Sequence, residues 1–133
     1  MPQGVSGLDA ELEQQVKALA LGRIGIGAVA LLTPGPALKR WLGPGSARPD
    51  TRWLARAVGS RDVAIGIGTL FALKHQSPVR GWLEAGALAD AGDLVASLLG
   101  IRELPRVRAL GTAGAALGGV LWSRRLVSQL PSS

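Results

Sequence analysis

The chain has 133 residues, which is enough for one domain, and its 15 Lys and Arg outnumber its 9 Asp and Glu, for a net charge of +6. It contains no Cys, so disulfides, thiolate metal sites and cysteine nucleophiles are excluded. The positive charges gather at the ends of apolar segments and in the connections between them, as in membrane proteins. We therefore do not expect nucleic acid among the partners of this protein.

Apolar segments follow one another along the chain, separated by prolines and polar turns. In chain order, the sequence divides into a polar, amphipathic lead-in at 1–15, apolar segments at about 16–33, 54–74, 80–100 and 106–127, and a tail at 128–133. Each segment is about as long as the helix of ~20 residues that spans a hydrocarbon layer of ~30 Å. The sequence thus predicts an all-α fold of four transmembrane helices in an antiparallel bundle, forming one membrane domain over 16–127.

A soluble four-helix bundle is the alternative, and it would need a polar face on each of its surface helices. Residues 63–73 and 109–122 have no such face, and the four glycines of the second stretch would weaken a helix in water. The Trp residues lie near segment ends, where indole rings favour the membrane interface. Lipid explains these stretches better than water does.

Positive charge also predicts an orientation. The connections 34–56 and 101–108 hold eight Lys and Arg residues, against five on the opposite side. Because positively charged connections stay in the cytoplasm, we expect a multi-pass protein of the cell membrane with both termini on the outer face. Within the first connection, apolar residues beside Lys39 and Arg40 predict a short helix lying on the membrane surface.

Five charged residues lie inside the apolar segments: Arg23, Arg61, Asp62, Asp90 and Asp93. A charge in the middle of a membrane helix costs about 2.5–3.5 kcal/mol on insertion scales, so it needs a partner or a role. Counting from the ends of antiparallel helices places Arg23 at the depth of Asp90, and Arg61 at the depth of Asp93. These depths predict two ion pairs and leave Asp62 as a surplus carboxylate, although Asp90 and Asp93 could exchange that role.

Glycine lines one face of the last apolar segment. Gly111, Gly114 and Gly118 recur at helical spacing, and the last two form a Gly-x-x-x-Gly pattern. Small residues on a common face let two helix backbones approach closely in lipid. We therefore expect this face to serve helix packing.

The buried charges lead to the first functional hypothesis, that the Arg/Asp cluster binds a small ligand, a lipid or a proton. One alternative is a structural or accessory membrane subunit that packs through its glycine-rich faces. Another is a membrane enzyme that uses a buried carboxylate as a general acid. A fully paired network that only fixes the order of the helices is the structural reading of the same residues. No catalytic residue, cofactor or metal site is predicted, and the expected partners are the lipid bilayer and a second copy or another membrane protein.

Three motifs connect the sequence to a known kind of protein. Residues 59–66 read Gly-x-Arg-Asp-x-x-x-Gly and residues 90–93 read Asp-x-x-Asp, after an early helix with Gly-Arg-Ile-Gly at 22–25 and a closing Pro34. Together they resemble a family of small four-helix integral membrane proteins of unknown function, with actinobacterial and fungal members. The resemblance covers about residues 16–122. It implies the fold and the membrane location, and it carries over no catalytic role.

Overall fold

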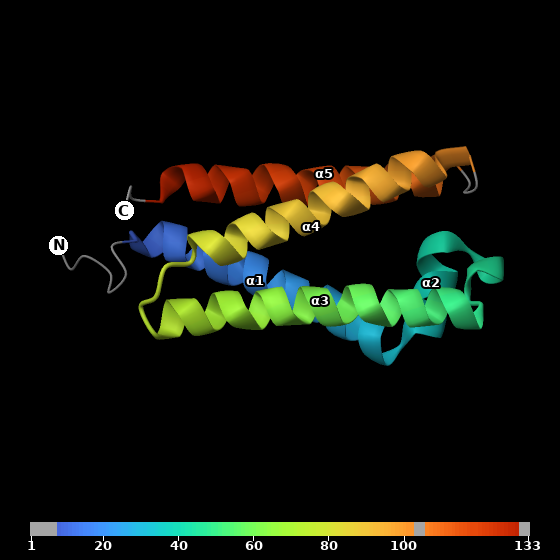
Figure 1. The fold of residues 1–133 in the computed structure, drawn as a ribbon, viewed down its shortest axis with the longest axis horizontal. Coiled ribbons are helices and arrows are strands. Elements are labelled where there is room, and N and C mark those ends of the chain that lie inside the picture. Colours follow the sequence, from blue (N-terminus) through green and yellow to red (C-terminus); the bar gives the residue numbers. More distant parts are fainter. Residues whose placement is uncertain (1–7, 103–105, 131–133) are drawn as a thin grey trace.

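The computed structural model describes residues 8–102 and 106–130, and within these ranges every regular element is a helix. In chain order the elements are α1 (Ala10–Leu32), α2 (Pro34–Leu42), the 3-10 turn η1 (Pro44–Ser46), α3 (Pro49–Lys74), α4 (Arg80–Leu99), the 3-10 turn η2 (Gly100–Arg102) and α5 (Arg106–Gln129). Figure 1 shows the long helices side by side, with the start of α1 and the end of α5 at one end of the molecule and α2 at the other.

Helix α1 begins earlier than the sequence predicted. Asp9 caps it, because the Asp9 side chain accepts a hydrogen bond from the Leu12 N–H at 2.7 Å. Two glutamates in the first turn add negative charge where the helix dipole favours it. Residues 10–15 of the predicted lead-in therefore form the first turns of α1, and residues 1–7 lie outside the described ranges. The helix ends at Leu32, since Thr33 leaves the helical conformation and Pro34 opens α2.

The connection after α1 folds into α2 and η1, so a short helix is present where the sequence predicted one. Trp41 of α2 donates a hydrogen bond from its Nε1 to Thr112 Oγ1 of α5, at 2.8 Å. Gly43 follows α2 with φ at 108°, a conformation that favours glycine. Helix α3 then starts at Pro49, before the predicted residue 54, because proline is well suited to the first turn of a helix.

The long helices form two pairs, in which α1 packs along α3 and α4 packs along α5. The first pair is held close by glycine. A Cβ atom added to Gly27 of α1 would lie 2.6 Å from the carbonyl oxygen of Gly59 in α3. A Cβ atom added to Gly66 would lie 2.7 Å from the carbonyl oxygen of Ala20. Only glycine allows the two backbones to approach this closely.

One apolar core joins both pairs, and it lies at the end of the molecule where α1 begins. Its buried members are Leu8, Leu12, Val16, Leu19, Ala72, Val79, Leu83 and Leu126. Val16 of α1 and Leu126 of α5 are completely buried, at 0% exposure. This cluster fixes the two pairs against each other at that end, since burial of large aliphatic side chains is the main stabilising term available.

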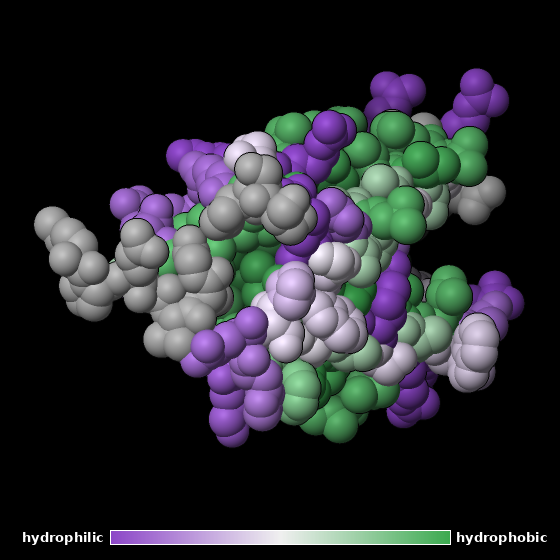
Figure 2. Space-filling model, turned by 60° about the vertical axis from the view of Figure 1, so that its left-hand side comes forward, coloured by the Kyte–Doolittle hydropathy of each residue, from purple (hydrophilic) through white to green (hydrophobic). Residues whose placement is uncertain are grey.

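The outer surface carries many large apolar side chains beside its charged ones. Nineteen large apolar side chains of the described residues are exposed, among them Leu32 and Leu88 at 75% and Ile26 at 71%. Figure 2 shows such side chains covering broad areas of the face in view. In water, contiguous apolar areas of this extent mark an interaction surface. The interior also holds two charged residues, Arg23 and Asp90, beside its apolar core, and buried charges of this kind are rare unless they are paired.

The sequence predicted a bundle of four transmembrane helices. This prediction is wrong, because the other described long helices do not meet the criteria for a membrane span that α1 meets. Among the described helices, only α1 has the length, mean hydropathy and low charge of a candidate span, and it lies near the N-terminus. Each 18-residue window of α3 and α4 holds more than two charged residues. In α5, glycines and arginines lower the mean hydropathy. The fold is therefore all-helical with one candidate membrane helix, and a multi-pass arrangement is not supported.

The glycine contact between α1 and α3 makes a prediction about stability. We expect Gly27→Ala to lower the free energy of unfolding by about 1–3 kcal/mol, because the new methyl group collides with the backbone of α3. Gly25→Ala is the matched control on the same helix, since no atom lies within 4 Å of its added Cβ. It should leave stability unchanged or slightly higher, because alanine favours the helix. Denaturant unfolding of the purified protein, followed by helical circular dichroism, measures both; equal effects would contradict the close approach.

Candidate functional site

The charged residues predicted from the sequence meet inside the molecule, where α1, α3 and α4 come together. Arg23 of α1 donates two parallel hydrogen bonds to Asp90 of α4: Nη1 bonds Oδ1 at 3.2 Å, and Nη2 bonds Oδ2. Both residues are buried, at 9% exposure. A two-pronged contact between a guanidinium and a carboxylate is the strongest geometry such a pair adopts.

A second pair lies beside the first and nearer to the surface. Arg61 of α3 donates from Nη1 to Asp93 Oδ1 at 3.1 Å and from Nη2 to Asp93 Oδ2 at 2.8 Å. About one third of each side chain is exposed, 33% for Arg61 and 36% for Asp93. Both ion pairs predicted from matched depths, Arg23 with Asp90 and Arg61 with Asp93, are thus confirmed.

Asp62 of α3 connects the two pairs. Its Oδ1 accepts hydrogen bonds from Arg61 at 3.3 Å and 3.1 Å, and the same oxygen lies 3.6 Å from Arg23 Nη1. The side chain of Asp62 is 15% exposed. The five residues therefore form one network, in which two guanidinium groups face three carboxylates. With all groups ionised, this Arg/Asp cluster carries one net negative charge.

The surroundings of the Arg/Asp cluster shift the pKa values of Asp62 and Arg61. Burial raises the pKa of the Asp62 carboxyl above its ordinary value, and the nearby Asp93 acts in the same direction. The positive charges of Arg61 and Arg23 oppose this increase without cancelling it. The hydrogen bond with Asp93 and the adjacent negative charges raise the pKa of Arg61 still further, so Arg61 stays protonated.

Two glycines make room for the buried pair. A Cβ atom added to Gly86 of α4 would lie 2.9 Å from Arg23 Nη2. One added to Gly119 of α5 would lie 2.8 Å from the carboxyl carbon of Asp90 and would strike its Oδ2. Helix α5 thus has no charged side chain in the cluster, and Gly119 leaves room for the carboxylate of Asp90. Gly86 lies on the same helix face as Asp90, a signal visible in the sequence, whereas Gly119 is one glycine among several in α5.

The glycine face of α5, which the sequence predicts to serve helix packing, meets no other helix among the described residues. No atom of the described residues lies within 4 Å of a Cβ added to Gly111, Gly114 or Gly118. The close packing predicted for these three is therefore not made within the described part of this chain. The glycines that do permit close approach lie on α1, α3 and α4, and at Gly119.

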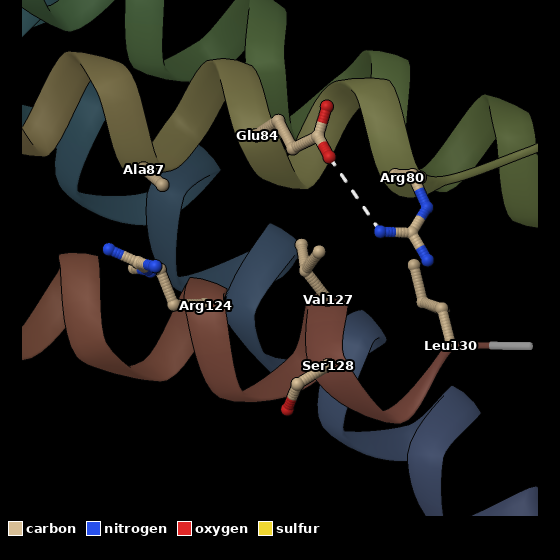
Figure 3. A pocket seen from close by; sticks show the side chains of 7 residues that line it. All are labelled: Arg80, Glu84, Ala87, Arg124, Val127, Ser128 and Leu130. Carbon is tan, nitrogen blue, oxygen red and sulfur yellow. Dashed lines mark ion pairs between the residues drawn. The ribbon is translucent and has the colours of Figure 1, made fainter. Parts of the chain in front are cut away.

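A groove lies between α4 and α5, away from the Arg/Asp cluster. It encloses about 570 Å³, and its lining consists of Arg80, Glu84, Ala87, Arg124, Val127, Ser128 and Leu130. Figure 3 shows Arg80 and Glu84 on α4 facing the last turns of α5, with an ion pair of 3.7 Å between them. None of the lining residues belongs to the cluster, so this groove gives a ligand no route to Asp90 or Asp93.

The cluster's charge balance predicts that its aspartates are not equivalent. Asp90→Asn should lower the free energy of unfolding by about 1.5–3 kcal/mol, because Arg23 loses its two charge-assisted hydrogen bonds and keeps only the 3.6 Å contact with Asp62. Asp62→Asn should change it by about 1 kcal/mol or less, because two neutral pairs remain. Denaturant unfolding measures both variants, with Asp50→Asn, an exposed aspartate, as the control.

Similar losses for Asp62→Asn and Asp90→Asn would contradict this charge balance. Should Asp90→Asn fail to accumulate, Asp93→Asn gives the same comparison at a partly exposed position, where a smaller loss is expected.

Comparisons with known proteins leave the chain without an assigned family. No family model matches it, and no curated protein and no solved structure is significantly similar to it. The resemblance to small four-helix membrane proteins therefore remains an expectation drawn from the sequence motifs. Any functional conclusion depends on the geometry of the Arg/Asp cluster and on the surface around it.

Proposed function

We propose that this is a membrane protein in which the Arg/Asp cluster binds and releases a proton at Asp62. The observation that carries the proposal is the imbalance of the network, with two guanidinium groups and three carboxylates in a buried site. A proton on Asp62 leaves two neutral pairs, whereas its loss leaves one uncompensated negative charge. Burial of such a charge is costly, which favours the protonated form.

The many exposed apolar side chains support a membrane location. Only 22% of the candidate span in α1 is buried within the fold, so α1 does not resemble the core helix of a water-soluble protein. Exposed apolar side chains also occur on the other long helices, for example Ile67 at 54%, Leu88 at 75% and Leu117 at 44%. Lipid chains would cover these side chains, and charged residues inside such a protein face the interior.

A proton fits the cluster better than a larger ligand does. The Arg23–Asp90 pair is buried, with glycines of α4 and α5 closed around it. The groove between α4 and α5 does not reach it. The Arg61–Asp93 pair is one-third exposed and adjoins Asp62 through Arg61, which gives a proton a short polar route from the surface.

The basic residues give the proposed orientation. Helix α2, the start of α3 and the start of α5 lie at one end of the molecule, and the start of α1 and end of α5 lie at the other. If the basic end faces the cytoplasm, α1 runs from the outer face toward the inner face.

Titration of Asp62 is the test of the proton proposal. A raised pKa means that the folded protein holds the proton more tightly than the unfolded chain does. The stabilisation is fully present below the ordinary aspartate pKa of about 4 and is lost as the pH rises through the raised value. We therefore expect wild-type stability to fall relative to Asp62→Asn over that interval, in unfolding experiments on detergent-purified protein.

Infrared spectroscopy supplies the independent readout. Wild type should show the carbonyl stretch of a protonated carboxyl group at a pH where exposed aspartates are ionised, and Asp62→Asn should lack it. Asp50→Asn, which alters an exposed aspartate, should keep it. The proposal fails if wild type shows no such band, or if the stability difference between wild type and Asp62→Asn is independent of pH.

A structural or accessory subunit is the second candidate, and the open glycine face of α5 favours it. Gly111, Gly114 and Gly118 meet nothing within the described chain, so a partner helix could approach there. We expect Gly114→Leu to weaken any such assembly while leaving the monomer folded, since the new side chain enters open space. Native mass spectrometry reports the stoichiometry, and a monomer in both wild type and variant would remove this candidate.

A further inference from the structure

Basic side chains from two separate parts of the sequence converge at one end of the molecule. Those exposed there are Lys39, Arg40, Arg48, Arg52, Arg56, Arg102 and Arg106. The first five come from α2, the residue before α3 and the first turns of α3, and the others come from η2 and the start of α5. Figure 1 places these elements at the end opposite to the start of α1. We call this surface the basic end.

Two direct contacts hold the halves of the basic end together. Trp41 of α2 donates a hydrogen bond to Thr112 of α5 at 2.8 Å. The guanidinium of Arg108 lies against Gly43, at the close of α2. The convergence of positive charge is therefore a property of the folded chain and not of a single segment.

Within the described part of the chain, little negative charge offsets these residues, and Glu103 lies outside that part. Among the described residues of α2, η1, η2 and the first turns of α3 and α5, the one acidic side chain is Asp50, which is 3.7 Å from Arg48. In addition, Arg108 Nη1 is buried and has no hydrogen-bond partner among the described residues. A buried donor without an acceptor is costly, and it adds one more positive charge to this end of the molecule.

Exposed apolar side chains lie beside the same charges. Trp41 is 57% exposed, Trp53 69% and Val107 83%. Indole rings favour the boundary between headgroups and hydrocarbon, and basic side chains favour anionic headgroups. A free phosphate would use the charges and leave these apolar side chains in water. A lipid surface uses both.

We infer that the basic end binds the headgroups of anionic phospholipids. Lys and Arg side chains contact the phosphate oxygens, while Trp41 and Trp53 lie at the level of the headgroups. This surface is distinct from the Arg/Asp cluster, although the inference shares with the proposed function the membrane location of the protein.

Native mass spectrometry of the full chain tests the inference, in detergent micelles with equal amounts of phosphatidylglycerol and phosphatidylcholine. Wild type should retain phosphatidylglycerol preferentially. The triple variant Lys39→Gln, Arg40→Gln and Arg106→Gln should lower that preference at least about tenfold, because each basic residue near the surface contributes independently. These three are exposed and make no hydrogen bond or ion pair among those of the described residues, so the fold should persist.

The matched control is Lys74→Gln, Arg124→Gln and Arg125→Gln, which removes three exposed charges at the opposite end. It should retain the wild-type preference. An equal loss in both triple variants, or no preference in wild type, overturns the inference. So does displacement of phosphatidylglycerol by equimolar inorganic phosphate or by an RNA oligonucleotide.

A salt series on wild type keeps the test decisive if the triple variant does not fold. Retention of phosphatidylglycerol should fall steadily with rising sodium chloride, and retention that ignores salt overturns the inference. Asp62→Asn should bind phosphatidylglycerol as wild type does, so failure of the lipid inference and failure of the proton proposal are told apart.

Discussion

The structure depends on the need to neutralise charge in its interior. Arg23 and Asp90 are both buried at 9% exposure, and neither would be tolerated there without the other. Their pairing fixes α1 against α4, and the pairing of Arg61 with Asp93 fixes α3 against the same helix. The glycines follow from this requirement, because side chains at Gly86 or Gly119 would displace the paired groups. Charge pairing thus sets the order of the helices around α4.

Two different interactions hold the two ends of the molecule. Near the start of α1, aliphatic side chains from every long helix form a continuous core. Toward α2, the pairs are joined by polar contacts, such as the hydrogen bond from Trp41 to Thr112. The Arg/Asp cluster lies between α1, α3 and α4. A single hydrophobic core therefore does not explain the fold, and exposed apolar side chains in this number are typical of an interaction surface.

Much of the helical organisation could be predicted from local sequence, because prolines and apolar runs mark helix limits that depend on few distant contacts. The ion pairs could also be predicted, since Arg23, Arg61, Asp90 and Asp93 stand out against apolar neighbours. The number of membrane spans was predicted wrongly, because length and apolar content were weighed above the charges, and α3 and α4 hold more than two charged residues in every 18-residue window. The role of Gly119 depends on which helix lies opposite Asp90. Spacing within α5 carries no such information.

The position of Asp62 affects how strongly α1 and α3 are held against α4. Asp62 competes with Asp90 and Asp93 for the same two guanidinium groups, yet Asp62 belongs to the α1–α3 pair and its competitors belong to α4. When Asp62 is ionised, it draws Arg23 and Arg61 toward its own pair and repels the carboxylates opposite. A proton on Asp62 ends that competition and directs both arginines to α4. Protonation of Asp62 would then strengthen the contact of α1 and α3 with α4, and deprotonation would weaken that contact.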